Sequence, residues 1–193
     1  MMSQNIEIEF KNMLTKAEYE RLLKELKVNK QQIFSQENHY FDTKEFALKS
    51  SSSALRIRQA PTGFELTLKQ PADIGLLETN QPLSKEEALH AIQFNKLPKG
   101  EIQQIIEKGG ISYCDLEYFG SMTTNRVEVE YNQGLLVLDH SIYLNTEDYE
   151  LELEVDEEQQ GKESFWKLLK QFDIPVRKTK NKIRRFYEQK YAD

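Results

Sequence analysis

The chain has 193 residues and a formal net charge of −6 at pH 7, with 30% charged and 38% hydrophobic residues. This length suffices for one domain over residues 1–193, and the composition is that of a folded globular protein and not of a disordered chain. No stretch approaches the roughly 18 consecutive apolar residues that a membrane span needs, so we expect no membrane insertion.

The cysteine and histidine content indicates the compartment and the kind of site. The single Cys114 cannot close an intrachain disulfide, and the N-terminal residues form neither a basic region nor an apolar run of signal-peptide length. We therefore expect a cytoplasmic protein, monomeric or homodimeric, with Cys114 buried and inert. The spacing of His39, His90 and His140 is not that of a metal cluster, so we expect surface or loop roles for them.

The first element is a strand around the sequence Glu7-Ile8-Glu9-Phe10-Lys11. Side chains of a strand point alternately to opposite faces, so Glu7, Glu9 and Lys11 share one face and the apolar residues share the other. By itself this pattern is typical of an ordinary half-solvated antiparallel strand.

The rest of the first half combines capped helices with alternating strands. Capping boxes that begin at Thr15 and Ser84 predict helices over residues 15–27 and 84–92, and a third helix is expected over 101–108. An aromatic segment at 38–43 reads as a short strand, and segments 54–58 and 64–69 form a predicted hairpin around a Pro-Thr-Gly turn. A weaker strand at 76–80 is expected to stop at Pro82.

The second half repeats this alternation. Strands are predicted at 126–131, 135–139 and 149–156, followed by a helix at 163–172 and a basic helix at 178–189. Asp139 either faces the same side as the late acidic strand or begins a turn at His140-Ser141. The helices flank the strands without alternating one for one, which favours an α+β fold over a doubly wound parallel sheet.

The charged residues on the alternating strands gather on one face. A passive outer surface would be expected to mix in more uncharged polar residues, since surface substitutions are nearly neutral. The alternative is an eight-stranded antiparallel β-barrel, a tunnel with a charged interior and flanking helices. The residues of this face are Glu7, Glu9, Lys11, Arg56, Arg58, Glu65, Lys69, Glu78, Arg126, Glu128, Glu130, Glu150, Glu152 and Glu154.

Such an interior has a definite ligand chemistry. Clustered carboxylates bind hard divalent cations such as Mg²⁺ or Mn²⁺, whereas Arg and Lys bind phosphate oxygens. A metal-bound polyphosphate satisfies both kinds of group. The basic C-terminal stretch from Arg177 could instead be a nucleic-acid arm, but Ile183, Phe186 and Tyr187 recur within it at helical spacing, so we expect a packing helix and no nucleic-acid partner.

Several motifs together resemble the CYTH superfamily, the triphosphate tunnel metalloenzymes. Residues 7–11 match its ExExK signature, and residues 38–43 look like its aromatic segment. Residues 54–58 and 65–69 resemble its RxR and LTLK strands, and residues 150–154 resemble its late acidic strand. ExExK alone is a weak signal, but these motifs in this order are a strong one.

The resemblance implies a tunnel that binds a triphosphate with one or two Mg²⁺ or Mn²⁺ ions. Where many members carry paired acids this chain has Glu78-Thr79-Asn80, so the second metal position is less secure. The implied phosphate-binding residues are Lys11, Arg56, Arg58, Lys69, Arg126 and either Lys180 or Lys182. The implied metal ligands are Glu7, Glu9, Glu78, Glu128, Glu130, Asp139, Glu152 and Glu154, and the implied catalytic residues are Glu7, Glu9, Lys11, Glu152 and Glu154.

The function expected from this resemblance is metal-dependent hydrolysis of a small-molecule triphosphate, either inorganic tripolyphosphate or a nucleoside or organic triphosphate. Two alternatives remain open. A class IV-type adenylate cyclase would need an adenine pocket, for which no residues can be named. A non-catalytic polyphosphate- or nucleotide-binding protein would bind without turnover.

Overall fold

A computed structural model describes residues 2–132 and 134–192 of the protein. The strands form a closed antiparallel β-barrel, and helices connect some of them. The strands hydrogen-bond in the cyclic order β1-β5-β4-β3-β2-β6-β7-β8. This confirms the predicted eight-stranded barrel. The strands are β1 (Ser3–Leu14), β2 (Phe34–Asp42), β3 (Ala54–Ala60), β4 (Gly63–Pro71), β5 (Leu76–Leu83), β6 (Glu117–Tyr131), β7 (Gly134–Tyr143) and β8 (Thr146–Val155).

The helices begin at side chains that cap them. Thr15 and Ser84 form the predicted capping boxes of α1 and α3, and Asn181 caps α6 by accepting from the Arg184 N–H. The helices are α1 (Lys16–Glu25), α2 (Ala47–Ser50), α3 (Lys85–Phe94), α4 (Glu101–Lys108), α5 (Glu158–Gln171) and α6 (Lys182–Lys190), with short 3-10 turns at Lys30–Gln32 and Tyr113–Asp115. No helix among the described residues is long and apolar enough to cross a membrane.

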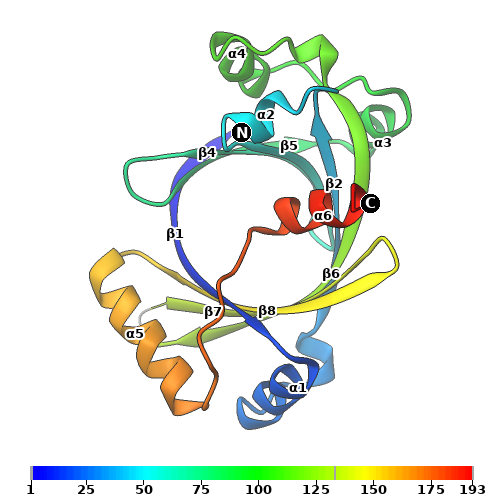
Figure 1. The fold of residues 1–193 in the computed structure, drawn as a ribbon. Coiled ribbons are helices and arrows are strands. Elements are labelled where there is room, and N and C mark those ends of the chain that lie inside the picture. The colour runs from blue at the N-terminus through cyan, green and yellow to red at the C-terminus, as the bar shows by residue number, and fades with distance from the viewer. Residues whose placement is uncertain (1, 133, 193) are drawn as a thin grey trace. The chain divides into compact units, whose positions relative to one another are not determined.

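The chain forms two compact units, each with its own apolar core. The first comprises residues 1–6 and 36–122, and the second comprises residues 7–35 and 123–193. In the first unit, α3 and α4 pack beside β4 and β5 over a core that includes Leu55, Leu66 and Ile102 (Figure 1). In the second unit, α1 and α5 pack beside β8 over a core that includes Leu151 and Leu168.

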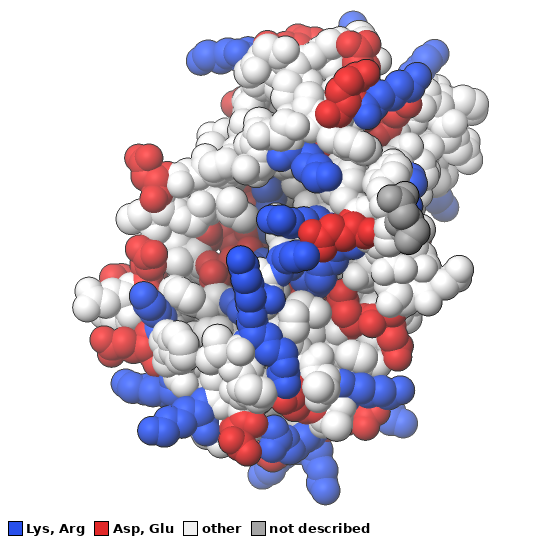
Figure 2. Space-filling model, in the orientation of Figure 1, with Lys and Arg blue, Asp and Glu red and all other residues white. Residues whose placement is uncertain are grey.

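The strand register of the second unit fixes which residues share the charged face. β1 pairs with β8 so that Glu9 lies opposite Glu154 and Lys11 lies opposite Glu152. Leu151 and Leu153 alternate with these acids and belong to the core under the helices, so the acids lie on the other side of the sheet. Lys and Arg are interspersed with Asp and Glu over the face that Figure 2 shows, in keeping with the mixed charge of the chain.

Several predicted boundaries are wrong. Strand β5 continues through Pro82 to Leu83. Strand β7 continues to Tyr143, so no turn begins at His140, and Asp139 lies inside the strand. Helix α5 begins earlier than predicted, because the Glu157 side chain accepts from the backbone N–H groups of the first turn. Helix α6 begins later, at Lys182.

Two single-residue predictions are also wrong. Cys114 is exposed, because its 3-10 turn buries the neighbouring Tyr113 instead. His39 lies within β2 and is 7% exposed, so it has neither a surface nor a loop role.

Candidate functional site

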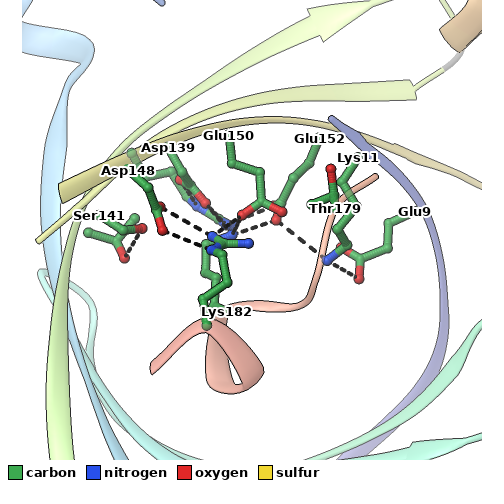
Figure 3. A network of polar contacts seen from close by, with 12 residues as sticks. Glu9, Lys11, Asp139, Ser141, Asp148, Glu150, Glu152, Thr179 and Lys182 are labelled. Atoms are coloured by element: carbon green, nitrogen blue, oxygen red, sulfur yellow. Dashed lines mark hydrogen bonds and ion pairs between the residues drawn. The ribbon is translucent and has the colours of Figure 1, made fainter. Parts of the chain in front are cut away.

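A buried cluster of acids and bases lies on the charged face of the second unit. Figure 3 shows side chains from β1, β7, β8 and α6 pointing toward one another (Figure 3). The acids at its centre, Asp139, Glu150 and Glu152, are at most 3% exposed. Charges removed from water in this way are stable only when they are paired and hydrogen-bonded.

Lys182 is the central base of this cluster. Its Nζ lies 2.9 Å from Asp139 Oδ2, 2.8 Å from Glu150 Oε2 and 2.5 Å from Glu152 Oε1. Burial alone would lower the pKa of Lys182, but the three carboxylates raise it well above its ordinary value. The residue is therefore a cation in the folded protein.

Arg126 is the second base, from β6. Its guanidinium donates to both oxygens of Asp139 at 2.8 and 2.6 Å and to Glu152 at 3.0 Å. Burial alone would lower the pKa of Arg126, and the adjacent carboxylates of Asp139 and Glu152 raise it well above its ordinary value. The paired geometry with Asp139 also fixes the plane of the guanidinium.

Lys11 joins the cluster from β1. Its Nζ lies 2.6 Å from Glu9 Oε1 and 3.6 Å from Glu152 Oε1. Burial alone would raise the pKa of Glu152, whereas the charges of Lys182, Lys11 and Arg126 hold it well below its ordinary value. Glu152 is thus an ionised carboxylate surrounded by three cations.

Glu154, two residues further along β8, has a different environment. Burial raises its pKa to about 7, Arg126 partly opposes this shift, and the carboxylates of Glu7, Glu152 and Glu9 reinforce it. The carboxylates of Glu7, Glu9 and Glu154 thus lie near one another at this end of the cluster. Carboxylate oxygens are the ligands that hard divalent cations take. In this structure, however, no group of three or more His, Cys, Asp or Glu side chains within residues 2–132 and 134–192 is arranged so that it could hold a metal ion.

The other predicted metal ligands of the second unit lie elsewhere. Glu130 is exposed, and Glu128 is 41% exposed with its carboxylate 3.9 Å from Arg126. Asp139 and Glu152, which were also predicted as ligands, have Arg126 and Lys182 as their partners. Of the acids near Glu154, Glu9 also contacts a base, with its Oε1 2.6 Å from Lys11 Nζ.

The two candidate lysines of the C-terminal segment are separated by the structure. Lys182 contacts the buried acids, whereas Lys180 forms an ion pair with Glu188 in which both side chains are about half exposed. Because α6 begins at Lys182, that side chain lies in the first turn and reaches the cluster. Lys182 is therefore the better candidate for phosphate binding.

The first unit has a basic cluster of its own, on β3, β4 and β5. Glu78 Oε1 lies 2.7 Å from Lys69 Nζ and 3.8 Å from Arg56. Burial alone would raise the pKa of Glu78, but Lys69, Arg56 and Arg58 lower it to about 2. Glu78, which was predicted as a metal ligand, thus contacts basic side chains in this structure. Arg58 also donates to Asn38 at 3.4 Å.

Three polar atoms beside this basic cluster are buried without a hydrogen-bond partner among the described residues: Arg56 Nε, Thr67 Oγ1 and Asn80 Oδ1. The three residues form one row, because Arg56 lies opposite Thr67 on β3 and β4 and Thr67 lies opposite Asn80 on β4 and β5. Buried polar groups are normally satisfied. Both a donor and acceptors are therefore available to a bound ligand or to water.

Sequence reasoning missed Arg185 and Asp148 of the buried cluster in the second unit, and it placed Glu150 on the charged face without giving it a role. Arg185 donates to Asp148 at 2.8 Å and to Glu150 at 2.7 Å. Arg185 follows Lys182 by three residues, so the two share a helix face, and that spacing could have indicated it. Asp148 and Glu150 belong to the same two-residue repeat as Glu152, which was the available signal for both acids.

Comparison with known proteins identifies relatives along the whole chain. A Bacillus subtilis (strain 168) protein named as a proposed triphosphatase, YjbK, is 51% identical over 189 residues, which are 98% of each chain. The crystal structure of a Bacillus halodurans protein described as a proposed adenylate cyclase is 44% identical, with a TM-score of 0.93 over 95% of this chain and 98% of that one.

A more distant structure has the same fold. A Hippeastrum protein, described as a proposed adenylyl cyclase with a dominant triphosphatase activity, is 23% identical, with a TM-score of 0.81 over 95% of this chain and 96% of that one. The family model of the CYTH domain matches residues 5–187. The chain therefore belongs to the CYTH family.

Proposed function

We propose that this protein hydrolyses a small-molecule triphosphate and releases orthophosphate. The observation that carries the proposal is the convergence of three cations, Lys11, Arg126 and Lys182, on the buried carboxylate of Glu152. Its relative YjbK, which is 51% identical over nearly the full length, is named as a proposed triphosphatase. Inorganic tripolyphosphate and nucleoside or organic triphosphates are the substrates to be compared.

In this proposal the cations bind and orient phosphate oxygens. Arg126 is held in a fixed plane by Asp139, and Lys182 is held by three acids, so neither side chain must be ordered when substrate arrives. Phosphoryl transfer needs mainly positioning of the reacting groups and neutralisation of charge on the transferred group. Fixed cations beside that group supply both.

We assign the divalent metal to Glu7, Glu9 and Glu154, because the carboxylates of Glu7 and Glu9 lie close enough to Glu154 to act on its charge. Mg²⁺ or Mn²⁺ bound there would polarise a phosphoryl oxygen and neutralise part of the substrate charge. Asp139, Glu150 and Glu152 are assigned a different task, which is to hold Lys182, Arg126 and Arg185 in place. This division follows from the contacts of Asp139, Glu150 and Glu152 with Lys182, whereas Glu9 would be shared by Lys11 and the metal.

The basic cluster of the first unit is also proposed to bind phosphate. Arg56 and Lys69 both contact Glu78, and Arg56 Nε and Thr67 Oγ1 are buried without hydrogen-bond partners among the described residues. A phosphate oxygen is a suitable acceptor for such donors. We further propose that the protein acts in the cytoplasm, in keeping with its single cysteine.

A substrate panel tests the function. Tripolyphosphate, ATP, GTP and thiamine triphosphate are each incubated with Mg²⁺ or Mn²⁺, and orthophosphate, pyrophosphate and cyclic nucleotide are measured. We expect orthophosphate from the wild type, strong loss of turnover in Lys11→Ala and Glu152→Gln, and little change in Lys180→Ala. Pyrophosphate with cyclic nucleotide from ATP would instead identify a cyclase, and tight tripolyphosphate binding without any product would identify a binding protein.

A further inference from the structure

The segment between α5 and α6 is fastened to the end of β1. We call residues 175–181 the strap. The Asn12 side chain donates to the Pro175 carbonyl at 3.1 Å and accepts from the Arg177 N–H at 2.6 Å. The Met13 N–H donates to Thr179 Oγ1 at 3.0 Å. Figure 3 shows Thr179 close to Lys11, and all these contacts lie within the second unit.

Asn12 is unusual for its position in β1. It follows Ile8 and Phe10 on the apolar face, and Phe10 packs against the core, yet Asn12 is an amide only 1% exposed. A buried amide without partners costs about 1–3 kcal/mol. Here its oxygen and its nitrogen both bond the strap backbone, so the strap accounts for a polar residue in an apolar row.

Arg177 makes a second anchor. Its guanidinium donates to the Met13 carbonyl at 2.9 Å and to both carboxylate oxygens of Glu18 at 2.8 and 2.9 Å. Burial would raise the pKa of Glu18, but the hydrogen bonds from Arg177 and Thr15 lower it below its ordinary value. The strap is thereby tied to the first turn of α1 as well as to β1.

We propose that Asn12 and Arg177 are positioning residues that place Lys182 in the buried cluster. The anchors hold the strap beside Lys11, and α6 begins with Lys182 shortly after it. Lys182 and Lys11 both contact Glu152 Oε1, so the strap fixes one lysine relative to the other. The inference rests on the proposed function only in taking Lys182 as a phosphate-binding residue.

The physical reason is the order that phosphate binding requires. Lysine has a long side chain with much rotamer freedom, and ordering it on binding would cost affinity. Anchors in the strap order the backbone that carries Lys182 before substrate binds. Loss of an anchor is thus expected to act on substrate binding through Lys182, and not only on the stability of the fold.

The first experiment measures lysine reactivity without substrate. Each protein is treated with a lysine-acylating reagent, and the acylation rate of Lys182 is followed by mass spectrometry, with exposed Lys85 in the first unit as the internal reference. We expect Arg177→Ala to raise the Lys182 rate at least about tenfold, since a charge-assisted hydrogen bond contributes about 1.5–3 kcal/mol. We expect Asn12→Leu to raise it several-fold, since each neutral hydrogen bond that it removes contributes about 0.5–1.5 kcal/mol. Arg21→Ala, which loses a contact to the Phe172 carbonyl but leaves the strap anchors intact, is the matched control and should not change it.

The second experiment is a double-mutant cycle on the KM for tripolyphosphate. Arg177→Ala is expected to raise KM about tenfold in the wild type, in proportion to one lost charge-assisted interaction. When Arg177→Ala is added to the Lys182→Ala variant, KM should stay within about twofold of that of Lys182→Ala alone, because Arg177 affects substrate binding only through Lys182. The Tm of each variant is measured alongside.

Defined outcomes overturn the proposal. Equal acylation rates of Lys182 in wild type and Arg177→Ala would contradict it, and so would a KM increase of the same size in both backgrounds. If Asn12→Leu does not fold, Arg177→Ala and the partly conservative Arg177→Lys still provide the comparison. Absence of turnover in the wild type would contradict the proposed function, whereas the acylation rates would still decide whether the anchors position Lys182.

Discussion

The ammonium of Lys182 lies 2.5 Å from Oε1 of Glu152, deep in a cluster where this carboxylate is 3% exposed. The same oxygen is 3.6 Å from Lys11. One ionised acid therefore sets the separation of two lysines from opposite ends of the chain. A polyphosphate site needs such fixed spacing between cations, because successive phosphates present their oxygens at regular intervals.

The two lysines of the C-terminal segment are expected to behave differently. Lys182→Ala removes a buried cation with three acidic partners, whereas Lys180→Ala removes a half-exposed partner of Glu188, and exposed pairs contribute about 0–1 kcal/mol. We expect Lys182→Ala to raise the KM for tripolyphosphate at least about tenfold and Lys180→Ala to leave it within about twofold. Equal effects of both changes on steady-state kinetics would contradict the assignment.

The Thr67 hydroxyl is expected to lower the stability of the folded protein and to contribute to the binding of tripolyphosphate. It is buried without a partner among the described residues, so Thr67→Val keeps the shape and removes an unsatisfied polar group. We expect the free energy of unfolding in urea to stay equal or rise by about 1 kcal/mol, while the affinity for tripolyphosphate falls several-fold. Thr62→Val, the same change at an exposed turn residue between β3 and β4, is the control. A loss of stability without a loss of affinity would contradict a ligand role for Thr67.

Much of the charged face could be predicted, because the alternation of side chains along a strand determines which residues share a face of the sheet. The period of two placed Glu9, Lys11 and Glu152 on one face without knowledge of the fold. It could not give the register, and the register is what brings Lys11 opposite Glu152. Nor could it separate Lys180 from Lys182, since that depends on Asn181 being the residue that caps α6.

The roles of the acids were harder to predict than their positions. A carboxylate that binds a metal and one that holds a lysine look the same in sequence, and only their neighbours distinguish them. Asp139 and Glu78 were expected to bind metal, yet their partners are basic side chains. Asn12 carried an overlooked signal, because it is a polar residue in the apolar row of β1.

Glu154 predicts a pH dependence of stability in metal-free buffer. The pKa of Glu154 rises from an ordinary 4.5 to about 7 on folding, so between these values the folded state binds more protons than the unfolded state. Stability from this group is therefore full below about pH 4.5 and is lost as pH rises through 7. Glu154→Gln cannot ionise, so relative to its difference from wild type at pH 5 it should gain about 1 kcal/mol at pH 8, after allowance for solvent screening.

Urea unfolding of both proteins at pH 5, 6, 7 and 8 measures this dependence, with exposed Glu158→Gln as the control. The control should follow the wild-type curve at each pH. A constant difference between Glu154→Gln and wild type over the whole range would show that the carboxylate does not titrate in this window.

Metal binding should depend on Glu9 and Glu154 and not on the acids that contact Lys182 and Arg126. In the presence of EDTA, added Mn²⁺ in excess is expected to raise the Tm of the wild type, since a ligand that binds only the folded state stabilises it. The increase should be lost in Glu9→Gln and Glu154→Gln, because removing one carboxylate from a small set of oxygen ligands weakens a hard-cation site. Glu128→Gln is the matched control: Glu128 is 41% exposed beside Arg126, and its loss should leave the Mn²⁺ shift unchanged. A shift that persists in Glu154→Gln but disappears in Glu128→Gln would move the metal to the acids of β6.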